Sequence, residues 1–242
     1  MTGQGALAGK AGIVTGGGSG IGAAIVREIA RLGARVVVAD LSPERAAAVA
    51  AAVGEGAVGV AADVRRFADL EAARDACLER FGRLDFAVAN AGVADSSTMS
   101  EGDPERWKLV IDTNVLGVAQ TVRAALPTML AQGGGHLVLM ASVSGREPYA
   151  GEPIYAATKW AVVGLGHALR KETVGTGVRV TLVEPGIVDT PLVRSNPFAV
   201  AWMETIAPLA DEDVARAVAF ALSQPPHMAI NEIVLRPVGQ EV

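Results

Sequence analysis

The sequence predicts a doubly wound α/β fold, in which helices cover both faces of a mostly parallel sheet. Short runs of apolar, often β-branched residues alternate along the chain with longer segments of helical periodicity. Six of these runs lack polar alternation, as expected of strands that are covered on both faces. Half of the 242 residues are apolar and 28 are glycine, which suits a buried parallel sheet with many tight turns. Successive parallel strands then require right-handed crossovers.

The expected elements follow from these patterns in chain order. Strands are expected at AGIVT (11–15), RVVVA (35–39), AVGVAA (57–62), LDFAVAN (84–90), GHLVLMAS (135–142), VRVTLVEP (178–185) and NEIVLR (231–236). Helices are expected at 21–32, 43–53, 67–81, about 104–130, 155–174 and 211–223. No Pro/Ser-rich linker interrupts this alternation, so we expect a single domain over 1–242.

One segment, 187–210, is far longer than an ordinary connection between a strand and a helix. It contains three prolines and the large apolar side chains of Phe198 and Trp202. Long loops with anchoring apolar residues often close over ligands, so we expect 187–210 to form a flap over a ligand site.

Composition excludes several classes of function. The formal charge is −5 and the Lys and Arg residues are scattered, which argues against partners such as nucleic acid or an anionic membrane surface. The single cysteine, Cys77, excludes an internal disulfide and a multi-cysteine metal site. Three dispersed histidines, His136, His167 and His227, form no catalytic triad or metal pair by spacing, so no metal is expected. With no secretory signal and no run of about 18 apolar residues, a cytoplasmic protein is expected.

The segment TGGGSGIG (15–22) follows the first expected strand and opens the first expected helix. Gly16, Gly20 and Gly22 leave room for the backbone to approach a ligand, and Gly22 allows the helix to pack closely on the strand. The N–H groups at the helix N-terminus favour a pyrophosphate. The sequence therefore predicts a dinucleotide site here.

Asp40, at the end of the second strand, is positioned to bind the adenosine ribose hydroxyls. Its charge would repel a 2′-phosphate, and neighbouring Ser19 and Leu41 offer no compensating cation, so NAD is favoured over NADP. Asp40 could also cap the helix at 43–53, although Ser42 is better placed for that role. Asp63 ends the third strand and could either reach the adenine or cap the helix at 67–81.

Taken together, the motifs of this chain resemble those of the short-chain dehydrogenase/reductase family. TGGGSGIG fits the family's TGxxxGIG loop, and NAG (90–92) fits its NNAG motif with Ala89 in place of the first Asn. PG (185–186) matches the turn after the sixth strand. The segments HLVLMASVSG and NEIVLRP look most like a branch of broad-specificity ketone reductases and hydroxy-acid dehydrogenases. The resemblance implies a Rossmann-like sheet in the order 3-2-1-4-5-6-7, and a homotetramer or homodimer built through helices 104–130 and 155–174 and the last strand.

The resemblance also implies a catalytic set of Asn114, Ser142, Tyr155 and Lys159. In YAATK (155–159), Tyr155 and Lys159 share one helical face. A free phenol has a pKa near ~10, and a nearby ammonium and a positive nicotinamide lower it, so Tyr155 could exchange a proton with an alcohol or ketone. Ser142 could hold the substrate oxygen. In the family, Asn114 lies at a helical irregularity that holds a water linked to Lys159, and Lys159 also binds the nicotinamide ribose.

The expected cofactor contacts extend along the carboxyl edge of the sheet. Thr190 is expected to bind the nicotinamide carboxamide, with helix capping as the alternative. The residues expected to bind the cofactor are Thr15, Gly16, Gly18, Ser19, Gly20, Ile21, Gly22, Asp40, Leu41, Asp63, Val64, Asn90, Ala91, Gly92, Tyr155, Lys159, Pro185, Gly186, Val188 and Thr190.

The substrate side is mostly apolar, which favours a small ketone or secondary alcohol without several charges. The expected pocket residues are Val93, Ala94, Ser142, Val143, Ser144, Glu152, Ile187, Phe198 and Trp202. Glu152 would disfavour an anionic substrate if it pointed inward, and the sequence leaves its orientation open. Arg146 and Arg194 could instead receive a carboxylate. A cofactor-bound regulatory or scaffolding protein without turnover is the alternative function, which the intact catalytic set disfavours.

Overall fold

The computed structural model describes residues 5–194 and 196–241, apart from the side chains of Pro197 and Phe198. Within these residues, seven parallel strands form one sheet in the order β3-β2-β1-β4-β5-β6-β7. The strands are β1 (Ala11–Thr15), β2 (Arg35–Asp40), β3 (Ala57–Ala61), β4 (Phe86–Ala89), β5 (Gly135–Met140), β6 (Val178–Pro185) and β7 (Glu232–Leu235). The predicted fold class and strand order are confirmed.

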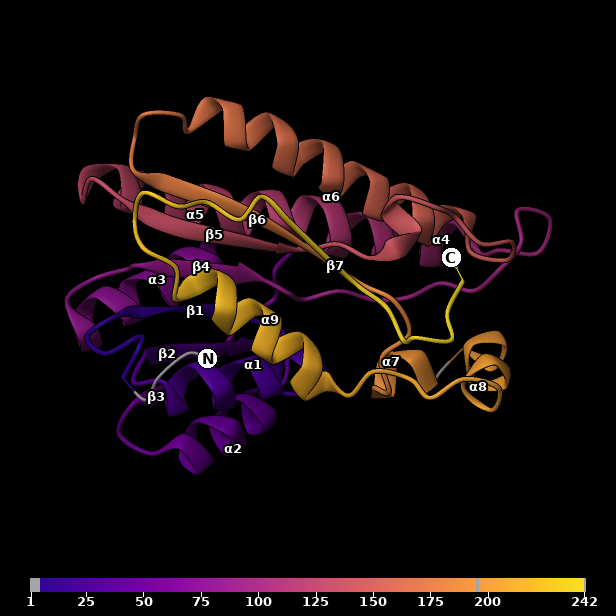
Figure 1. The fold of residues 1–242 in the computed structure, drawn as a ribbon, viewed down its shortest axis with the longest axis horizontal. Coiled ribbons are helices and arrows are strands. Elements are labelled where there is room, and N and C mark those ends of the chain that lie inside the picture. The colour runs from indigo at the N-terminus through magenta and orange to yellow at the C-terminus, as the bar shows by residue number, and fades with distance from the viewer. Residues whose placement is uncertain (1–4, 195, 242) are drawn as a thin grey trace.

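Helices cover both faces of this sheet (Figure 1). They are α1 (Gly20–Arg31), α2 (Pro43–Val53), α3 (Phe67–Phe81), α4 (Pro104–Ile111), the π-helical turn η1 (Asp112–Leu116), α5 (Gly117–Ala131), the 3-10 turn η2 (Val143–Gly145), α6 (Pro153–Glu172), α7 (Pro191–Arg194), α8 (Pro197–Met203) and α9 (Asp211–Leu222). The helix predicted at about 104–130 is present as α4, η1 and α5 without a break, and the π-helical turn η1 is the irregularity that the resemblance implied at Asn114. The helix predicted from 155 begins earlier, at Pro153, whose fixed φ suits a first helical position.

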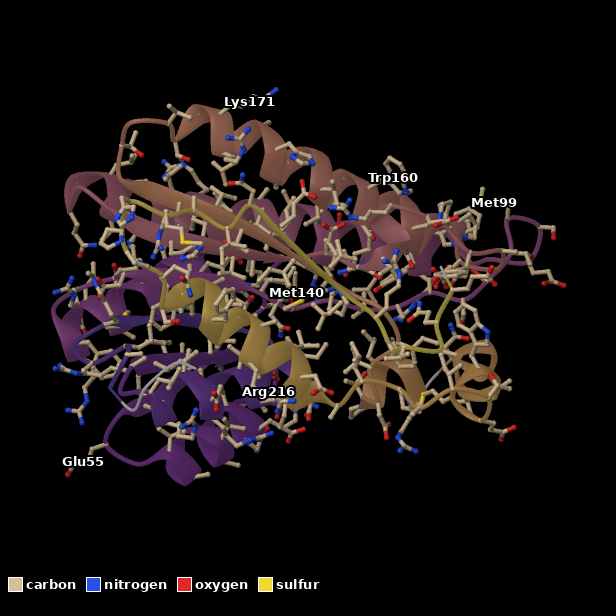
Figure 2. All side chains as sticks on the ribbon, viewed as in Figure 1. Glu55, Met99, Met140, Trp160, Lys171 and Arg216 are labelled. Atoms are coloured by element: carbon tan, nitrogen blue, oxygen red, sulfur yellow. The ribbon has the colours of Figure 1, made fainter. Side chains whose placement is uncertain are left out.

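Two apolar cores lie on opposite sides of the sheet, because successive side chains of a strand point to opposite faces. In β1, Val14 packs into the core shared with α1, α2 and α9. Its neighbour Ile13 packs into the core shared with α3, α5 and α6. Met140, in β5, lies between the layers, whereas Glu55 and Lys171 project from the surface (Figure 2). Both faces of the central strands are thus buried, as their unbroken apolar runs predict.

The flap segment 187–210 leaves the sheet at the carboxyl end of β6 and carries α7 and α8, which stand beyond the strand ends (Figure 1). A parallel bridge joins Val188 to Leu209 at its base. The Leu209 N–H donates to the Ile187 carbonyl at 2.9 Å, and the Asp189 N–H donates to the Leu209 carbonyl at 2.8 Å. The two ends of the segment are therefore fastened together, and α7 and α8 lie between them. None of the helices in the described ranges combines the length and apolarity needed to cross a membrane.

Candidate active site

Two cavities meet at the carboxyl edge of the sheet. The first, of about 370 Å³, extends from the glycine loop past Asp40 and Asp63 to Lys159. The second, of about 380 Å³, lies between the segment that follows β5 and the flap. Both cavities are lined by Ser142, Tyr155, Gly186, Leu192 and Val193. The carboxyl ends of parallel strands are where ligands bind in open α/β sheets.

The glycine loop at the start of α1 requires its small residues. Gly16 has φ +63°, and a Cβ on Gly22 would stand 2.1 Å from the Gly16 carbonyl oxygen. Gly20 has φ +47°, and a Cβ there would be in van der Waals contact with Thr190 at 3.6 Å; Gly20 and Thr190 both line the first cavity. The loop and the N-terminus of α1 therefore leave a backbone-lined hollow beside Thr190, which fits the pyrophosphate of a dinucleotide.

Two predicted cofactor residues do not line this cavity. The buried Thr15 hydroxyl instead accepts from the N–H of Asn90 at 3.1 Å and of Ala91 at 3.3 Å, which holds the NAG segment against β1. The Gly18 N–H donates to Asp40 at 2.9 Å. Thr15 and Gly18 therefore do not line the cavity themselves but hold residues that do. The other predicted cofactor residues line it.

Asp40 is almost fully buried, and its carboxylate is heavily bonded. It accepts from the backbone N–H of Gly18 and of Ser42, each at 2.9 Å. Its Oδ1 also accepts from Nη2 of Arg45 at 2.9 Å. The prediction that no cation compensates Asp40 was therefore wrong: Arg45 lies in the first turn of α2 and reaches back. Ser42 caps α2, as predicted, by accepting from the Arg45 N–H at 3.2 Å.

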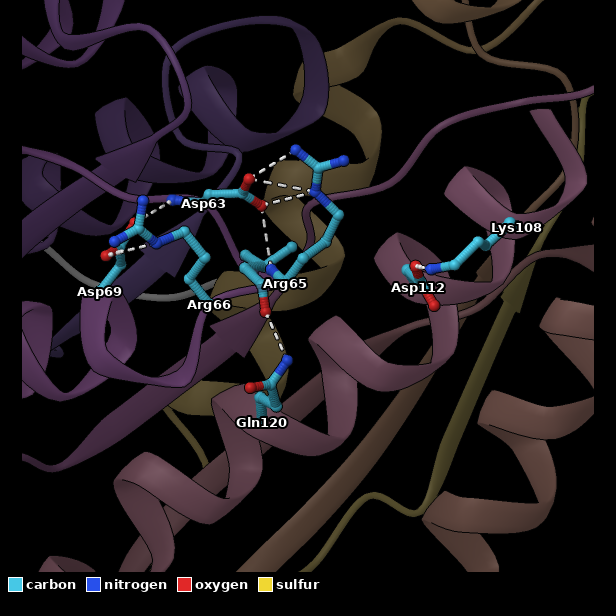
Figure 3. A network of polar contacts seen from close by, with 8 residues as sticks. Asp63, Arg65, Arg66, Asp69, Lys108, Asp112 and Gln120 are labelled. Atoms are coloured by element: carbon cyan, nitrogen blue, oxygen red, sulfur yellow. Dashed lines mark hydrogen bonds and ion pairs between the residues drawn. The ribbon is translucent and has the colours of Figure 1, made fainter. Parts of the chain in front are cut away.

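A second cation stands at this end of the cavity. Arg65 binds the Asp63 carboxylate through Nε at 2.8 Å and Nη2 at 2.5 Å (Figure 3). That hydrogen bond holds the pKa of Asp63 below its usual value. Asp63 does not cap α3, because the N-cap residue is Arg66. Gln120, on α5, donates to the Val64 carbonyl at 3.1 Å and fastens the loop in place. The sequence reasoning missed both Arg45 and Arg65 as lining residues.

Asn114 lies in η1, where the helix widens. Its side-chain amide donates to the Val93 carbonyl at 2.9 Å and to the Thr158 hydroxyl at 3.2 Å, while its oxygen accepts from the Val93 N–H at 2.9 Å. The Thr158 hydroxyl donates to the Tyr155 carbonyl at 2.6 Å. A Cβ on Gly92 would come within 3.3 Å of the Asn114 oxygen. Asn114 therefore ties the loop after β4 to the first turns of α6.

Tyr155, Lys159 and Ser142 come together from α6 and the end of β5. A side-chain hydrogen bond joins Tyr155 and Ser142. The Lys159 ammonium is buried, donates to the Met140 carbonyl at 3.1 Å and lies 5.5 Å from the centroid of the Tyr155 ring. Ser142 is fixed in turn as the N-cap of η2, accepting from the Ser144 N–H at 3.2 Å. The three predicted side chains form one cluster.

The electrostatics of this cluster differ from the prediction. Burial raises the pKa of Tyr155, the charge of Glu152 raises it further, and the hydrogen bond with Ser142 opposes them. Burial lowers the pKa of Lys159 to about 8. The Lys159 ammonium, itself buried, is not among the causes of this shift, and the lowering of the phenol pKa expected from a positive nicotinamide stays a prediction. At neutral pH the protein's own groups keep Tyr155 protonated.

The second cavity contains most of the predicted substrate residues. Ala94, Val143, Ser144, Ile187 and Trp202 line it, and Phe198 falls outside the described side chains. Val93 lines the first cavity instead.

Tyr149 and Gln240 are among the residues of the second cavity that the predicted set missed. Gln240 accepts from the Ile187 N–H at 2.9 Å and donates to the Tyr149 hydroxyl at 2.9 Å. The Tyr149 ring meets Trp202 edge to face, with centroids 5.1 Å apart. A sequence separation of 91 residues between Tyr149 and Gln240 gave no signal that they would meet.

Glu152 points into the second cavity, which settles the orientation that the sequence left open. The Ser144 hydroxyl donates to its Oε1 at 2.6 Å, and burial raises the pKa of the carboxyl group.

The two arginines expected to receive a substrate carboxylate are engaged elsewhere. Arg146 binds the fully buried Glu184 at 2.6 and 2.7 Å and also pairs with Glu232. Arg194 binds Asp189 at 2.6 and 2.7 Å. That prediction was wrong, because each guanidinium has a nearer carboxylate.

Thr190 has the capping contact that was the alternative reading. Its hydroxyl accepts from the Val193 N–H at 3.3 Å in α7, and the residue also lines the first cavity. No group of three or more His, Cys, Asp or Glu side chains in the described part of the chain is arranged to hold a metal ion.

Comparisons with known proteins agree with this geometry. A family model described as short chain dehydrogenase matches residues 10–198. An uncharacterized oxidoreductase of Staphylococcus aureus (strain MW2) is 40% identical over 234 residues, which cover 96% of this chain and 99% of that protein. A 3-ketoacyl-(acyl-carrier-protein) reductase from Brucella melitensis, solved with NADH, superposes with a TM-score of 0.89 at 30% identity, covering 95% of this chain and 97% of the other. The closed form of a serine dehydrogenase with NADP+ gives a TM-score of 0.91 at 31% identity and 96% coverage of both chains.

Proposed function

The chain belongs to the short-chain dehydrogenase/reductase family of oxidoreductases, and we propose that it transfers a hydride between a nicotinamide cofactor and a ketone or secondary alcohol, with Tyr155 as general acid and base. The observation that carries the proposal is the position of Tyr155 and Ser142 at the junction of the two cavities. A cofactor in the first cavity and a carbonyl in the second would meet beside these two hydroxyls.

The residues of the first cavity fit a dinucleotide. The hollow beside Gly20 and the N-terminus of α1 would hold the pyrophosphate, Asp40 the adenosine ribose, and Lys159 the nicotinamide ribose. When bound, the nicotinamide supplies or accepts the hydride. We propose NAD as the preferred cofactor, because the Asp40 carboxylate lies at the end of β2 where a 2′-phosphate would have to fit.

The protein's own groups then move the proton. In reduction, Ser142 donates a hydrogen bond to the substrate oxygen, and Tyr155 gives its proton to that oxygen as the alcohol forms. Oxidation reverses the transfer. Tyr155 suits the acid role because burial keeps its hydroxyl protonated at neutral pH. Lys159, with a pKa lowered to about 8, can return a proton to Tyr155. Asn114 and Thr158 are positioning residues, since their hydrogen bonds fix the backbone at Tyr155.

The test is Tyr155→Phe, assayed in both directions by the absorbance of the reduced nicotinamide. Loss of the general acid should lower kcat by about a hundredfold to ten-thousandfold, while NADH affinity stays within about threefold. Tyr149→Phe removes the chain's other phenol hydroxyl, from the wall of the second cavity, and should cost about tenfold at most. Unchanged turnover in Tyr155→Phe would overturn the assignment. Tight NADH binding without turnover on any ketone or alcohol would favour the regulatory protein instead.

We further propose that 1–242 is one domain and that 187–210 is a flap that closes on the substrate. Leu192 and Val193 line both cavities, and Asn196, Ala199 and Trp202 line the second, which supports this role. Protection of 187–210 from proteolysis by NADH and substrate together would test it.

We propose a homotetramer or homodimer built through the helical elements α4, η1, α5 and α6 and the last strand, β7. The exposed apolar side chains Ile111, Leu116 and Trp160 on the helical elements support an interface there. Analytical ultracentrifugation would measure the oligomeric state. A cytoplasmic location is proposed as well, and cell fractionation tests it.

A further inference from the structure

The charge of the second cavity is carried by one residue. Among the described residues that line it, Glu152 alone bears a formal charge, and the others are apolar, aromatic or neutral polar. The neighbouring arginines Arg146 and Arg194 are turned to other carboxylates, Arg146 to Glu184 and Glu232 and Arg194 to Asp189. Two further cations lie outside the lining and face carbonyl oxygens: Lys159 donates to Met140, and Arg106 donates to Ala94. The cavity is therefore negative, and within the described part its lining supplies no cation to receive an anionic substrate.

Glu152 is held in a fixed direction within this cavity. It is the N-cap residue of α6, and its side chain makes no cap contact with the helix. Instead Oε1 accepts from the Ser144 hydroxyl at 2.6 Å. A helix cap commonly uses its side chain on the free N–H groups of the first turn, so this orientation forgoes local stabilisation to place a carboxylate in the cavity. Burying that carboxylate costs free energy, which an ammonium ligand would offset.

Two aromatic residues of the same lining suit the same kind of ligand. The Tyr149 and Trp202 rings meet edge to face at 5.1 Å and both line the cavity. Aromatic rings attract cations electrostatically through their faces. A carboxylate with aromatic rings nearby is a combination that binds organic ammonium groups and repels carboxylates.

Glu152 also lies close to the reacting position. It is the N-cap residue three positions before Tyr155, and both residues line the second cavity. Its charge acts on the Tyr155 hydroxyl. A ligand whose oxygen meets Tyr155 would therefore present its adjacent carbons to Glu152.

We propose that the substrate is an amino alcohol or amino ketone with its ammonium group on the carbon next to the reacting carbon, and that Glu152 is the residue that selects it. This inference rests on the proposed function. In oxidation, the carbinol C–H bond breaks and its hydride goes to the nicotinamide, the O–H proton goes to the phenolate form of Tyr155, and the C=O bond forms. The ammonium group stays intact throughout, paired with Glu152.

Three nearly isosteric alcohols separate the contribution of charge from that of shape: protonated phenylethanolamine, neutral ethyl phenyl carbinol and anionic mandelate. For the wild type we expect kcat/KM to fall in that order, with the cation favoured over the neutral alcohol by about tenfold or more. Glu152→Gln keeps the size of the side chain and its contact with Ser144 but removes the charge. It should abolish the preference for the cation and improve mandelate. Glu147→Gln makes the same change on an exposed residue that does not line the cavity, and should leave all three ratios as in the wild type.

A binding measurement guards against a folding defect. Phenethylammonium should inhibit oxidation of the neutral alcohol competitively and more strongly than phenylacetate, and Glu152→Gln should reverse that order while binding NADH normally. A wild type that prefers the neutral alcohol or mandelate, or an unchanged preference in Glu152→Gln, would overturn the inference but leave the proposed function intact. Absence of turnover on all three alcohols and on the matching ketones, despite NADH binding, would instead count against the proposed function.

Discussion

Nη2 of Arg45 lies 2.9 Å from Oδ1 of Asp40 at the adenosine end of the first cavity. The carboxylate proposed to reject a 2′-phosphate therefore holds, in the same place, a cation that could accept one. Asp40 is almost fully buried, whereas the Arg45 side chain is 56% exposed and able to move. Cofactor choice thus depends on which of the two charges faces the ribose.

The wild type should prefer NAD, and Asp40→Asn should raise the ratio of kcat/KM for NADP to that for NAD by about tenfold or more. Asparagine keeps one acceptor oxygen, so it can accept from either Gly18 or Ser42 but not from both, and it no longer repels the phosphate or holds Arg45. Adding Arg45→Gln to Asp40→Asn should remove most of that gain, which a double-mutant cycle measures. A wild type that already prefers NADP would contradict the role given to Asp40.

Local patterns predicted the parts of the site that depend on local backbone. The glycine loop and the apolar strands are specified by residues close together in the sequence, and so is the YAATK pair on one helical face. Arg45 was missed because its side chain reaches back across the N-terminus of α2 to Asp40, a contact set by the rotamer rather than by spacing. Gln240 was missed because only the folding of the chain brings it to Ile187, from which it is 53 residues away in the sequence.

The pH profile of oxidation should respond to Glu152. Its negative charge is the second cause, after burial, of the raised pKa of Tyr155. Glu152→Gln should therefore lower the pKa of Tyr155. Because oxidation needs the phenolate to accept a proton, log kcat/KM for a neutral alcohol should begin to rise at lower pH in the variant. The control Glu147→Gln should keep the wild-type profile. A shift to higher pH would contradict this account.

The ion pair between Arg146 and Glu184 should be asymmetric in its contribution to stability. Glu184 is fully buried in β6, while the Arg146 side chain is 37% exposed just after η2 and keeps Glu232 as a partner. Arg146→Met leaves a buried carboxylate alone and should cost about 3 kcal/mol of the free energy of unfolding, against about 1 kcal/mol for Glu184→Gln. Urea unfolding measures both.

If Arg146→Met and Glu184→Gln lost the same free energy of unfolding at neutral pH, the burial of Glu184 would not determine what the ion pair contributes. Since the pair joins the turn that holds Ser142 to the strand that ends at Pro185, a loss of activity in Arg146→Met is expected to accompany the loss of stability.

His136, at the amino end of β5, is buried far from the proposed active site. Its Nε2 lies 2.8 Å from the Thr181 hydroxyl, which donates its own hydrogen to the Ile230 carbonyl at 2.5 Å. Nε2 must therefore be the donor, and the imidazole is neutral with its proton on that nitrogen. Its Nδ1 has no hydrogen-bond partner among the described residues. Burial, helped by the charge of Arg179, lowers the pKa of His136 to about 3.

Acid should therefore destabilise the fold through His136. Between its ordinary value of 6.5 and about 3, the unfolded chain binds a proton that the folded chain does not, so stability is lost as pH falls through this window. From neutrality to about pH 4 the loss from this residue is about 3 kcal/mol. His136→Gln should remove that dependence, so the wild type should lose about 3 kcal/mol more than the variant over this range. His227→Gln alters an exposed histidine instead, and should leave the dependence of stability on pH as it is in the wild type. Parallel urea-unfolding curves for wild type and His136→Gln across these pH values would show that His136 is not the group responsible.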